Sequence, residues 1–374
     1  MTMPPPTPAS AFSAADHAYM ARALRLAEQG LWTTSPNPRV GCVLVRDGRV
    51  VGEGWHQRAG EPHAEVHALR AAGAQARGAT AYVTLEPCSH HGRTPPCADA
   101  LVAAGVVRVV AAMRDPNPLV AGRGLLRLQE AGIATAAGLL DAAARELNIG
   151  FVARMERGRP WVRVKLASSL DGRTALANGK SQWITGPEAR RDGHRYRARA
   201  CAVLTGIGTV KDDDPRLSVR DVATSRQPWK VVVDSRLEIS PQAALFDGGP
   251  VLVACAVDLA ARPEAVAALA AAGGEVLSLP NAAGKVDLAA LLDELGRRGV
   301  NELHVESGFK LAGSFVREGL ADELLLYQAP TLLGDTASGL LTLPELADLA
   351  GQRRLTVVDR RQVGVDTRIL ARFA

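Results

Sequence analysis

The sequence has few aromatic residues, few cysteines and no long apolar run. Phe, Trp and Tyr make up 4% of the 374 residues, which argues against a general nucleic-acid surface, because such surfaces stack bases on aromatic side chains in a basic groove. The five cysteines follow no secretory signal, so we expect a cytoplasmic protein without disulfide bonds. No segment is apolar over the length needed to cross a bilayer. We therefore expect neither a nucleic-acid nor a membrane partner.

The length and the charge set wider bounds. A chain of 374 residues suggests two domains, and residues 1–12 begin with a proline-rich stretch that we expect to be a disordered tail. The net charge of +5 and the pI near 9.1 permit anionic partners. The densest basic segment, Arg190–Arg199, is either a solvated helix face or a clamp for a phosphate-bearing small molecule.

Strand and helix patterns alternate in the first part of the chain. Ser13 and Asp16 suit a capping box that opens a helix ending near Gly30. Strand patterns follow near Val40, Val50 and Tyr82 and at Val106–Ala111, and helical patterns lie between them. This order predicts a first domain over residues 13–150 in which helices sandwich one sheet.

A polar stretch at residues 148–160 interrupts the pattern, and we place the domain boundary there. Beyond it, alanine- and leucine-rich helical segments alternate with five strand patterns: Val162–Ala167, Lys230–Asp234, Val251–Ala256, Glu275–Leu279 and Glu302–Glu306. These predict a second α/β domain over residues 158–374, whose ligands would bind beyond the carboxyl ends of the strands.

The most informative motif joins His63, Glu65, Cys88 and Cys97. One imidazole and two thiolates can hold zinc and leave its fourth tetrahedral position open for water, as a catalytic site requires. Glu65 is placed to carry a proton from that water to a leaving amine. This arrangement is the signature of zinc nucleobase deaminases. A proline ends the strand before Cys88 and places this cysteine at the start of the next element, where helix-terminus amides favour a thiolate. We expect His63 and Cys88 to begin two helices on the same side of the sheet.

Two neighbouring segments belong to the same predicted site. The segment Ser89–Pro96, between the two cysteines, contains His90 and His91, which are rival ligands for the metal but suit substrate binding better. Asn37 lies between two prolines before a strand, where its amide can bind a base or a ribose or simply form a turn.

Motifs in the second domain are weaker. Gly206–Thr209 follows a strand but lacks the third glycine of a dinucleotide fingerprint. Gly308–Ser314 opens a predicted helix whose first amides could bind a phosphate. Lys165, Asp171, Asp213 and Glu306 lie at strand ends or in adjoining loops, which are positions that suit catalysis.

Taken together, these segments resemble the bifunctional deaminase/reductase family of riboflavin biosynthesis over almost the whole chain. The specific motifs are Ser35–Gly41, His63–Leu69, Thr84–Cys97, Asp115–Pro118, Ser169–Gly172, Ser181–Thr185 and Thr209–Pro215. The resemblance implies a cytidine-deaminase-like first domain and a dihydrofolate-reductase-like second domain.

The resemblance also implies two reactions on one phosphoribosyl pyrimidine. Zinc held by His63, Cys88 and Cys97 would serve hydrolytic loss of an amino group, with Glu65 moving the protons. NADPH would then reduce the ribosyl group to a ribityl group.

Carried over by motif, two further sets of residues are expected. The NADPH contacts would be Ala167, Trp183, Thr209, Asp213, Ser235 and the segment Gly308, Phe309, Lys310, Leu311, Ala312, Gly313 and Ser314. The substrate contacts would be Ser181, Arg197, Leu217, Arg220 and Glu306, with Asn37 in the first domain. Arg197 and Arg220 suit the substrate phosphate. Ser307 stands where the family usually has glycine, which places a Cβ where positive φ could be required.

Two other functions compete with this interpretation. A deaminase of nucleosides or RNA, with a C-terminal domain that only binds or dimerises, predicts no NADPH oxidation. A structural zinc site would require a fourth protein ligand, for which only His90 and His91 are close in sequence. We also expect a homo-oligomer, either a dimer or a tetramer.

Overall fold

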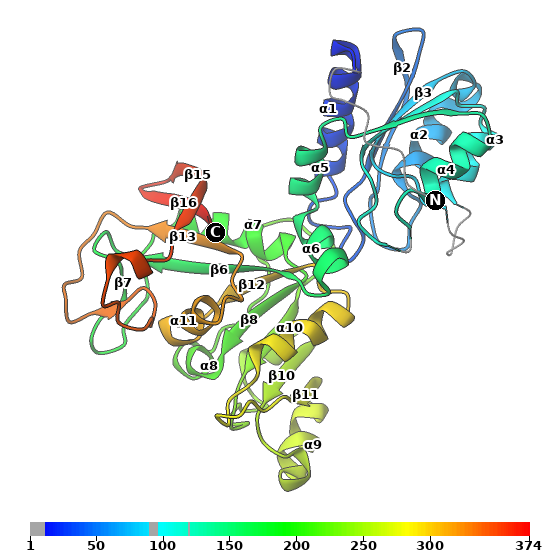
Figure 1. The fold of residues 1–374 in the computed structure, drawn as a ribbon. Coiled ribbons are helices and arrows are strands. Elements are labelled where there is room, and N and C mark those ends of the chain that lie inside the picture. Colours follow the sequence, from blue (N-terminus) through cyan, green and yellow to red (C-terminus); the bar gives the residue numbers. More distant parts are fainter. Residues whose placement is uncertain (1–11, 90–95, 119) are drawn as a thin grey trace. The chain divides into compact units, whose positions relative to one another are not determined.

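The computed structural model describes residues 12–89, 96–118 and 120–374 (Figure 1). Apart from Phe12, the predicted tail lies outside these residues. The chain forms two compact units, residues 1–157 and 158–374. Each unit has its own sheet and its own hydrophobic core. Among the described helices, none combines the length and the apolarity that a membrane span requires.

The first unit is built on a five-stranded sheet in the order β2-β1-β3-β4-β5. Its strands are β1 (Gly41–Arg46), β2 (Arg49–Trp55), β3 (Thr80–Leu85), β4 (Arg108–Met113) and β5 (Ala134–Ala137). Its α-helices are α1 (Ala14–Glu28), α2 (Ala64–Ala72), α3 (Cys97–Ala103), α4 (Arg123–Glu130), α5 (Asp141–Leu147) and α6 (Ile149–Arg157). The strands β3, β4 and β5 run parallel, whereas β1 pairs antiparallel with both of its neighbours.

Local sequence explains how α1 begins and how closely it packs. The predicted capping box is present, because Ser13 accepts from the backbone of Asp16 and Asp16 accepts from the backbone of Ser13. A Cβ on Gly41 would lie 2.0 Å from the carbonyl oxygen of Ala23, so glycine allows α1 to lie directly against β1. Gly54 has the same role for α2, since its Cβ would lie 2.4 Å from the carbonyl oxygen of Ala64.

The segment between the two predicted domains is helical. Residues 148–160 show no regular pattern in the sequence, but residues 149–157 form α6. The reason is a short apolar run: Phe151 and Val152 are buried in the core of the first unit, and the arginines that make the stretch look polar lie toward the helix's C-terminal end, where they suit the helix dipole.

The second unit contains a nine-stranded sheet in the order β11-β10-β9-β8-β12-β6-β13-β16-β15. Its strands are β6 (Trp161–Ser168), β8 (Ala202–Gly206), β9 (Trp229–Val233), β10 (Val251–Cys255), β11 (Gly274–Ser278), β12 (Glu302–Glu306), β13 (Glu323–Gln328), β15 (Leu355–Val363) and β16 (Asp366–Phe373). The short strands β7 (Arg173–Ala175) and β14 (Ser338–Gly339) form a separate pair. The α-helices are α7 (Pro187–Arg199), α8 (Ile207–Asp213), α9 (Pro263–Ala271), α10 (Leu288–Arg297) and α11 (Phe309–Arg317).

The direction of the strands decides where a ligand can bind. From β11 to β13 all neighbouring strands are parallel, whereas β16 pairs antiparallel with both β13 and β15. The carboxyl ends of β9, β8, β12 and β6 therefore lie along one edge of the sheet, where open α/β sheets bind their ligands.

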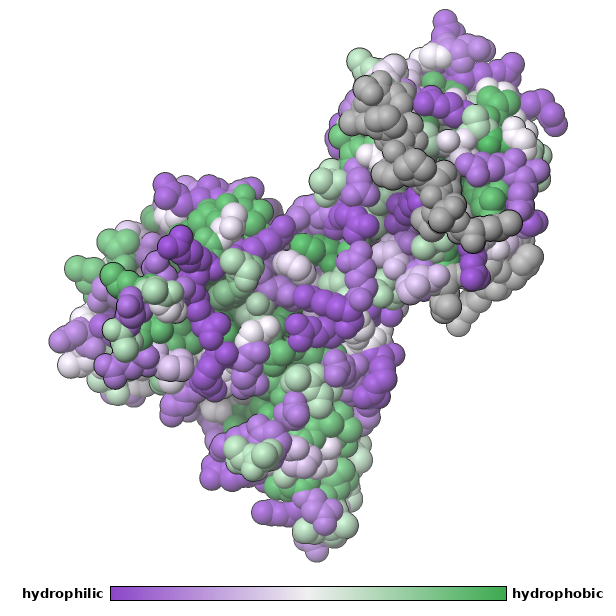
Figure 2. Space-filling view, in the orientation of Figure 1, coloured by the Kyte–Doolittle hydropathy of each residue, from purple (hydrophilic) through white to green (hydrophobic). Residues whose placement is uncertain are grey.

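The outermost strand of this sheet, β15, forms an exposed edge. The side chains of Leu355, Val357, Val358 and Val365, on β15 or in the turn after it, are between 37% and 66% exposed. Figure 2 shows hydrophobic residues at the surface over these C-terminal strands.

Buried ionic contacts form much of the packing between α7 and this sheet. Arg163 on β6 is buried between Glu302 on β12 and Glu323 on β13. Arg199 on α7 donates to the same Glu302 at 2.6 Å. The guanidinium of Arg163 lies over the ring of Tyr196, with its Cζ atom 5.1 Å from the ring centre. The basic helix is therefore attached to the sheet partly by paired charges, and Arg199 is not a solvated residue.

Candidate functional site

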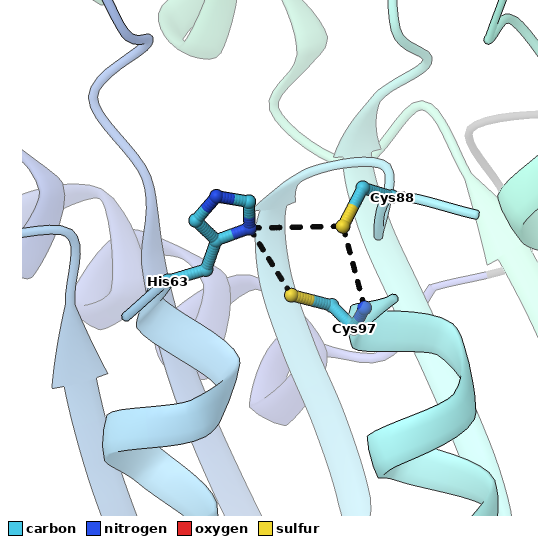
Figure 3. A group of neighbouring side chains, drawn as sticks. All are labelled: His63, Cys88 and Cys97. Atoms are coloured by element: carbon cyan, nitrogen blue, oxygen red, sulfur yellow. Dashed lines mark hydrogen bonds between the residues drawn. The ribbon is translucent and has the colours of Figure 1, made fainter. Parts of the chain in front are cut away.

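The three predicted zinc ligands come together from separate elements of the first unit (Figure 3). His63 is the N-cap residue of α2, Cys88 follows β3, and Cys97 is the first residue of α3. Their ligand atoms all lie within 4.8 Å of one another. Among the described residues, no other His, Cys, Asp or Glu joins this group.

The expectation that Cys88 begins a helix is wrong. Cys97 begins α3, and Cys88 lies in the preceding loop. The described residues around Cys88, 86–89, form neither a helix nor a strand. Pro87 is one reason, because a proline biases the residue before it toward extended backbone. Nevertheless the backbone N–H of Cys97 donates to the Cys88 sulfur at 3.3 Å. The amide at the start of α3 therefore stabilises the Cys88 thiolate.

The distances between the ligand atoms fit a tetrahedral zinc ion. His63 Nδ1 lies 3.2 Å from the sulfur of Cys97 and 3.7 Å from that of Cys88. Zinc–sulfur and zinc–nitrogen bonds of about 2.3 and 2.0 Å give tetrahedral edges of about 3.5 Å. The hydrogen bond with Cys97 lowers the pKa of Cys88, and the hydrogen bond with Cys88 raises the pKa of His63. The three side chains therefore fit a zinc site.

Glu65 lies in the first turn of α2 beside these ligands. Its side chain is buried, and its Oε2 atom has no hydrogen-bond partner within the described ranges. Burial raises the pKa of the carboxyl, and His63, Cys88 and Cys97 all act on it. A buried carboxyl oxygen without a partner is costly unless a ligand or water completes it. Glu65 thus has the position and the free oxygen that proton transfer at this site needs.

His56, which was not predicted as a site residue, connects Asn37 to the predicted zinc ligands. Its ring packs edge-on against that of His63, with 5.4 Å between the centroids. Its Nδ1 lies 3.2 Å from the carbonyl oxygen of Pro62, and its Nε2 lies 3.1 Å from Nδ2 of Asn37. Because the carbonyl can only accept, we infer that Nδ1 carries the proton and Nε2 accepts from the amide.

This tautomer fixes the orientation of Asn37. The amide nitrogen is used by His56, so the Oδ1 atom is the part of the group left to accept from a ligand. Burial lowers the pKa of His56, which agrees with a neutral ring. The available signal in the sequence was the position of His56 directly after β2 and seven residues before His63.

The rival ligands in the first unit and the cysteines outside the predicted zinc site complete the set. His90 and His91 lie outside the described residues. Cys42, Cys201 and Cys255 are free and buried, as expected for inert cysteines.

The predicted reductase residues follow the carboxyl ends of neighbouring strands in the second unit. Ala167 is on β6, Ser181 and Trp183 precede α7, Arg197 is on α7, Thr209 and Asp213 are on α8, Leu217 and Arg220 follow α8, Ser235 follows β9, Glu306 ends β12, and Gly308 caps α11. Since β9, β8, β12 and β6 are adjacent and parallel, most of this set lies along one edge of the sheet.

Several contacts join this set directly. Gln182 Nε2 donates to Asp213 at 2.8 Å, which connects the segment containing Trp183 to α8. Arg197 forms a two-fold hydrogen-bonded pair with Glu306 and also donates to the carbonyl oxygen of Ser218 at 3.0 Å. Trp183 itself is 69% exposed and stacks against the guanidinium of Arg190. An exposed tryptophan beside charged groups is available to a flat ligand.

Glu306 is the centre of the charged part of the site. Burial opposes its ionisation, but the Arg197 guanidinium holds the pKa of the carboxyl well below its usual range. Lys165 Nζ lies 3.9 Å from Oε2, and His304 Nε2 lies 3.3 Å from Oε1. Burial lowers the pKa of Lys165. Glu306 is therefore a mostly buried anion facing three nitrogen-bearing side chains.

The segment 308–314 is helical from Phe309 onward, which divides its residues into two groups. Ala312 is fully buried, and Gly313 packs against the backbone of Thr342, where a Cβ would lie 2.4 Å from the carbonyl oxygen. These two residues face the protein interior. The first turn of α11, after Gly308, has no side-chain cap, so its amides are the ones available to a phosphate.

Ser307 does not have a positive φ: among the described residues other than glycine, only Asp47, Leu140, Asp214, Leu217 and Leu237 do. The Cβ is therefore tolerated.

Buried polar atoms along this edge indicate that the residues present fit a polar cofactor. The side-chain oxygens concerned are Thr205 Oγ1 near the end of β8, Asp234 Oδ1 after β9, Ser307 Oγ after β12 and Ser168 Oγ at the end of β6, and none has a partner in the described part of the chain. Unsatisfied oxygens at four adjacent strand ends are unusual in a folded protein. A ligand with many hydrogen-bonding groups, such as NADPH, would satisfy them.

Both units match known protein families. Residues 13–113 match the cytidine and deoxycytidylate deaminase zinc-binding region, and residues 160–368 match the RibD C-terminal domain. The RibD protein of Escherichia coli K12 is 52% identical over 365 residues, which cover 94% of this chain and 97% of that protein. The chain belongs to the RibD family.

Solved RibD structures have the same fold. The Acinetobacter baumannii RibD structure is 44% identical, covers 96% of this chain and 99% of that chain, and superposes with a TM-score of 0.88. A Thermotoga maritima diaminohydroxyphosphoribosylaminopyrimidine deaminase/5-amino-6-(5-phosphoribosylamino)uracil reductase is 33% identical over the same shares, with a TM-score of 0.85. The predicted class of two α/β domains, a cytidine-deaminase-like domain followed by a reductase domain, is confirmed.

As a RibD protein, the chain is a bifunctional enzyme that catalyses two consecutive steps of riboflavin biosynthesis. The first is a zinc-dependent deamination and the second is an NADPH-dependent reduction. The alternative of a nucleoside or RNA deaminase with a non-catalytic second domain is not favoured, because that domain matches the RibD reductase domain over residues 160–368.

Proposed function

We propose that the first unit deaminates 2,5-diamino-6-(5-phosphoribosylamino)pyrimidin-4-one with His63, Cys88 and Cys97 as the zinc ligands. Zinc, when bound, would make a water molecule acidic enough to act as the nucleophile near neutral pH. Glu65 would take the proton on Oε2, its unpartnered atom, and pass it to the amino group that leaves as ammonia.

Asn37 and His56 would orient the pyrimidine in this reaction. Since His56 uses the amide nitrogen of Asn37, Oδ1 would accept a hydrogen bond from an N–H or hydroxyl group of the substrate. A neutral His56 packed on His63 would hold both the substrate contact and the ligand ring in place.

For the second step we propose that the edge formed by β9, β8, β12 and β6 holds NADPH and the ribosyl group. NADPH, when bound, would supply the hydride. The amides at the start of α11 would bind its phosphates, and Trp183, Thr209, Asp213 and Ser235 would contact the rest of the cofactor. Ala312 and Gly313 support the helix from its buried face.

On the substrate side, Glu306 would accept hydrogen bonds from ribose hydroxyls as a stable anion, beside Ser181 and the backbone of buried Leu217. Arg220 would contact the phosphate, since its guanidinium is exposed and, among the described residues, its side-chain hydrogen bond is a long one, 3.4 Å to Ser218 Oγ. Arg197 would contribute the N–H groups that Glu306 and Ser218 leave unused. The product of this reduction is 5-amino-6-(5-phosphoribitylamino)uracil.

The observation that most supports the proposal is the convergence of His63, Cys88 and Cys97 next to the unpartnered oxygen of Glu65. The test is to incubate the full chain with the diaminopyrimidine ribosyl phosphate, with and without NADPH, and to follow ammonia release and NADPH absorbance. We expect ammonia in both reactions and accumulation of the deaminated product only without NADPH. Oxidation of NADPH without any ammonia release would contradict the order of steps.

Self-association, location and partners stay predictions. We infer a homo-oligomer because β15 is an exposed edge strand with Val357 and Val358 at the surface, and such edges pair readily with a second copy. Light scattering of the purified chain tests this, and a concentration-independent monomer would contradict it. Cell fractionation tests the expected cytoplasmic location. Titration with RNA at low salt tests the expected lack of nucleic-acid binding.

A further inference from the structure

A buried carboxylate two residues before the zinc ligand Cys88 is satisfied entirely by backbone amides. Glu86 is 3% exposed. Its Oε2 accepts from the N–H groups of Asp115 and Gly122 at 3.1 and 3.0 Å. Its Oε1 accepts from those of Gly124 and Leu125 at 2.9 and 3.2 Å. Both oxygens therefore act only as acceptors, and each has two donors.

These contacts make Glu86 the cap of helix α4. The N-cap residue of α4 is Gly122, which has no side chain to accept from the first amides. Gly124 and Leu125 belong to the first turn, whose N–H groups have no partner within the helix. Glu86 supplies the missing acceptor from a different element, and its negative charge lies at the positive end of the helix dipole.

The same contacts fix the backbone that carries Cys88. The N–H of Glu86 donates to the carbonyl oxygen of Met113, at the end of β4, at 3.0 Å. On the other side, a Cβ on Gly124 would lie 1.9 Å from the carbonyl oxygen of Pro87, so α4 touches the backbone immediately before Cys88. The segment 86–87 is thereby held between β4 and the first turn of α4.

We propose that Glu86 is a positioning residue for the zinc site, which holds the sulfur of Cys88 in the geometry that zinc requires. This inference rests on the proposed ligand role of Cys88. It also gives a role to the Asp115–Pro118 motif, which neither reaction explains: its first amide is one of the four donors that hold Glu86. Zinc sites depend on outer contacts of this kind because these contacts set the orientation of the ligands.

The decisive variant is Glu86→Gln, which keeps the shape of the side chain. Glutamine has one acceptor oxygen, and its NH₂ group would face two backbone N–H donors. Two of the four hydrogen bonds are then lost, and the donors that face each other repel. We expect the affinity for zinc, measured by competition with a chelator, to fall about tenfold or more. The absorption bands of the Co²⁺-substituted protein should shift as well, because they report the geometry of the ligands.

A matched control separates positioning from general loss of stability. Asp16 is another buried carboxylate of the same unit, and its partners are Ser13, Tyr82 and Arg108 rather than the zinc loop. Asp16→Asn should lower the melting temperature but leave the zinc affinity and the Co²⁺ spectrum unchanged. NADPH-dependent reduction of the deaminated intermediate should stay unchanged in both variants, which shows that the second unit is intact.

A second variant covers the case in which Glu86→Gln fails to fold. Gly124→Ala places a methyl group against the Pro87 carbonyl and should weaken zinc binding from the other side of the same contact. If Glu86→Gln and Gly124→Ala bind zinc as tightly as the unmodified chain, with the same Co²⁺ spectrum, Glu86 is only a helix cap and the inference is wrong. If the unmodified chain binds no zinc at all, the ligand assignment itself is wrong.

Discussion

Arg197 on α7 and Glu306 at the end of β12 form a two-fold hydrogen-bonded ion pair, with Nη2 and Oε2 2.9 Å apart. Both residues are mostly buried, and the pair lies in the predicted substrate site of the second unit. Arg197 is the main reason that Glu306 stays ionised in spite of its burial. The consequences can be tested through the pH dependence of the reductase.

The first prediction concerns Arg197→Ala. Burial remains while the largest stabilising charge is removed, so the pKa of Glu306 should rise, although Lys165 stays nearby. If the anion is the active form, the variant's NADPH oxidation should fall as the pH is lowered from 8 to about 5, whereas that of the unmodified chain should stay nearly constant. An unpaired buried charge also costs about 3 kcal/mol of stability.

Arg199→Ala is the control, because Arg199, two residues after Arg197 at the end of α7, forms an ion pair with Glu302. It should destabilise the unit without changing the pH profile. Equal profiles for the two variants would show that Arg197 does not control the ionisation of Glu306.

The second prediction concerns Glu65→Gln. The variant keeps the size of the side chain but cannot take up the proton, so ammonia release should fall by about 10²- to 10⁴-fold. Zinc content, measured by elemental analysis, should stay at one ion per chain because the three ligands are unchanged. Glu53→Gln, which affects only a surface pair with Arg22, serves as the control. Full turnover in a zinc-loaded Glu65→Gln protein would show that another group moves the proton.

Features that depend on neighbouring residues in the sequence could be predicted. Short patterns predict the capping box at Ser13 and the strands β6, β9, β10, β11 and β12, and the structure contains them at or within one or two residues of the predicted positions. A short pattern also predicts the cluster of His63, Cys88 and Cys97, whose side chains lie together. Each pattern is set by neighbours in the sequence, either through side-chain periodicity or through a turn residue such as proline.

Contacts between distant segments carry no such local signal. Glu302 meets Arg163 and Arg199 only because β12 lies next to β6 and beneath α7, more than 100 residues away in the chain. The strands β13, β15 and β16 were not predicted. The exposed and charged β15 follows no alternating pattern, since nearly all of its residues are solvent-exposed. His56 was missed for the same reason, because its function depends on Asn37, 19 residues earlier.

The third prediction tests that missed residue. His56→Phe keeps a ring packed against His63 but removes the acceptor that orients Asn37. The amide can then rotate, and one hydrogen bond to the substrate is lost or misdirected, which is worth about 1 kcal/mol. The KM of deamination should rise about fivefold, with less change in kcat and no change in zinc content. The control is His67→Phe, because His67 lies on α2 one turn after His63. A KM that shifts equally in both variants would argue against a specific role for His56.

The last prediction concerns the stability of the second unit in mild acid. Burial lowers the pKa of His194 to about 4 in the folded chain, whereas an exposed histidine titrates near 6.5. Between these two values the unfolded chain binds a proton that the folded chain excludes, so the free energy of unfolding decreases as the pH falls through this window and is unaffected above it. The decrease attributable to His194 should be on the order of 2 kcal/mol, less than the full difference in pKa implies because Asp221 nearby is half exposed.

Denaturant titrations at pH 7 and pH 4.5 measure this loss of unfolding free energy. The difference between the two pH values should shrink in His194→Gln, which can still accept from the N–H of Arg220 as His194 does. An identical pH dependence in the variant would mean that other groups cause the loss of stability.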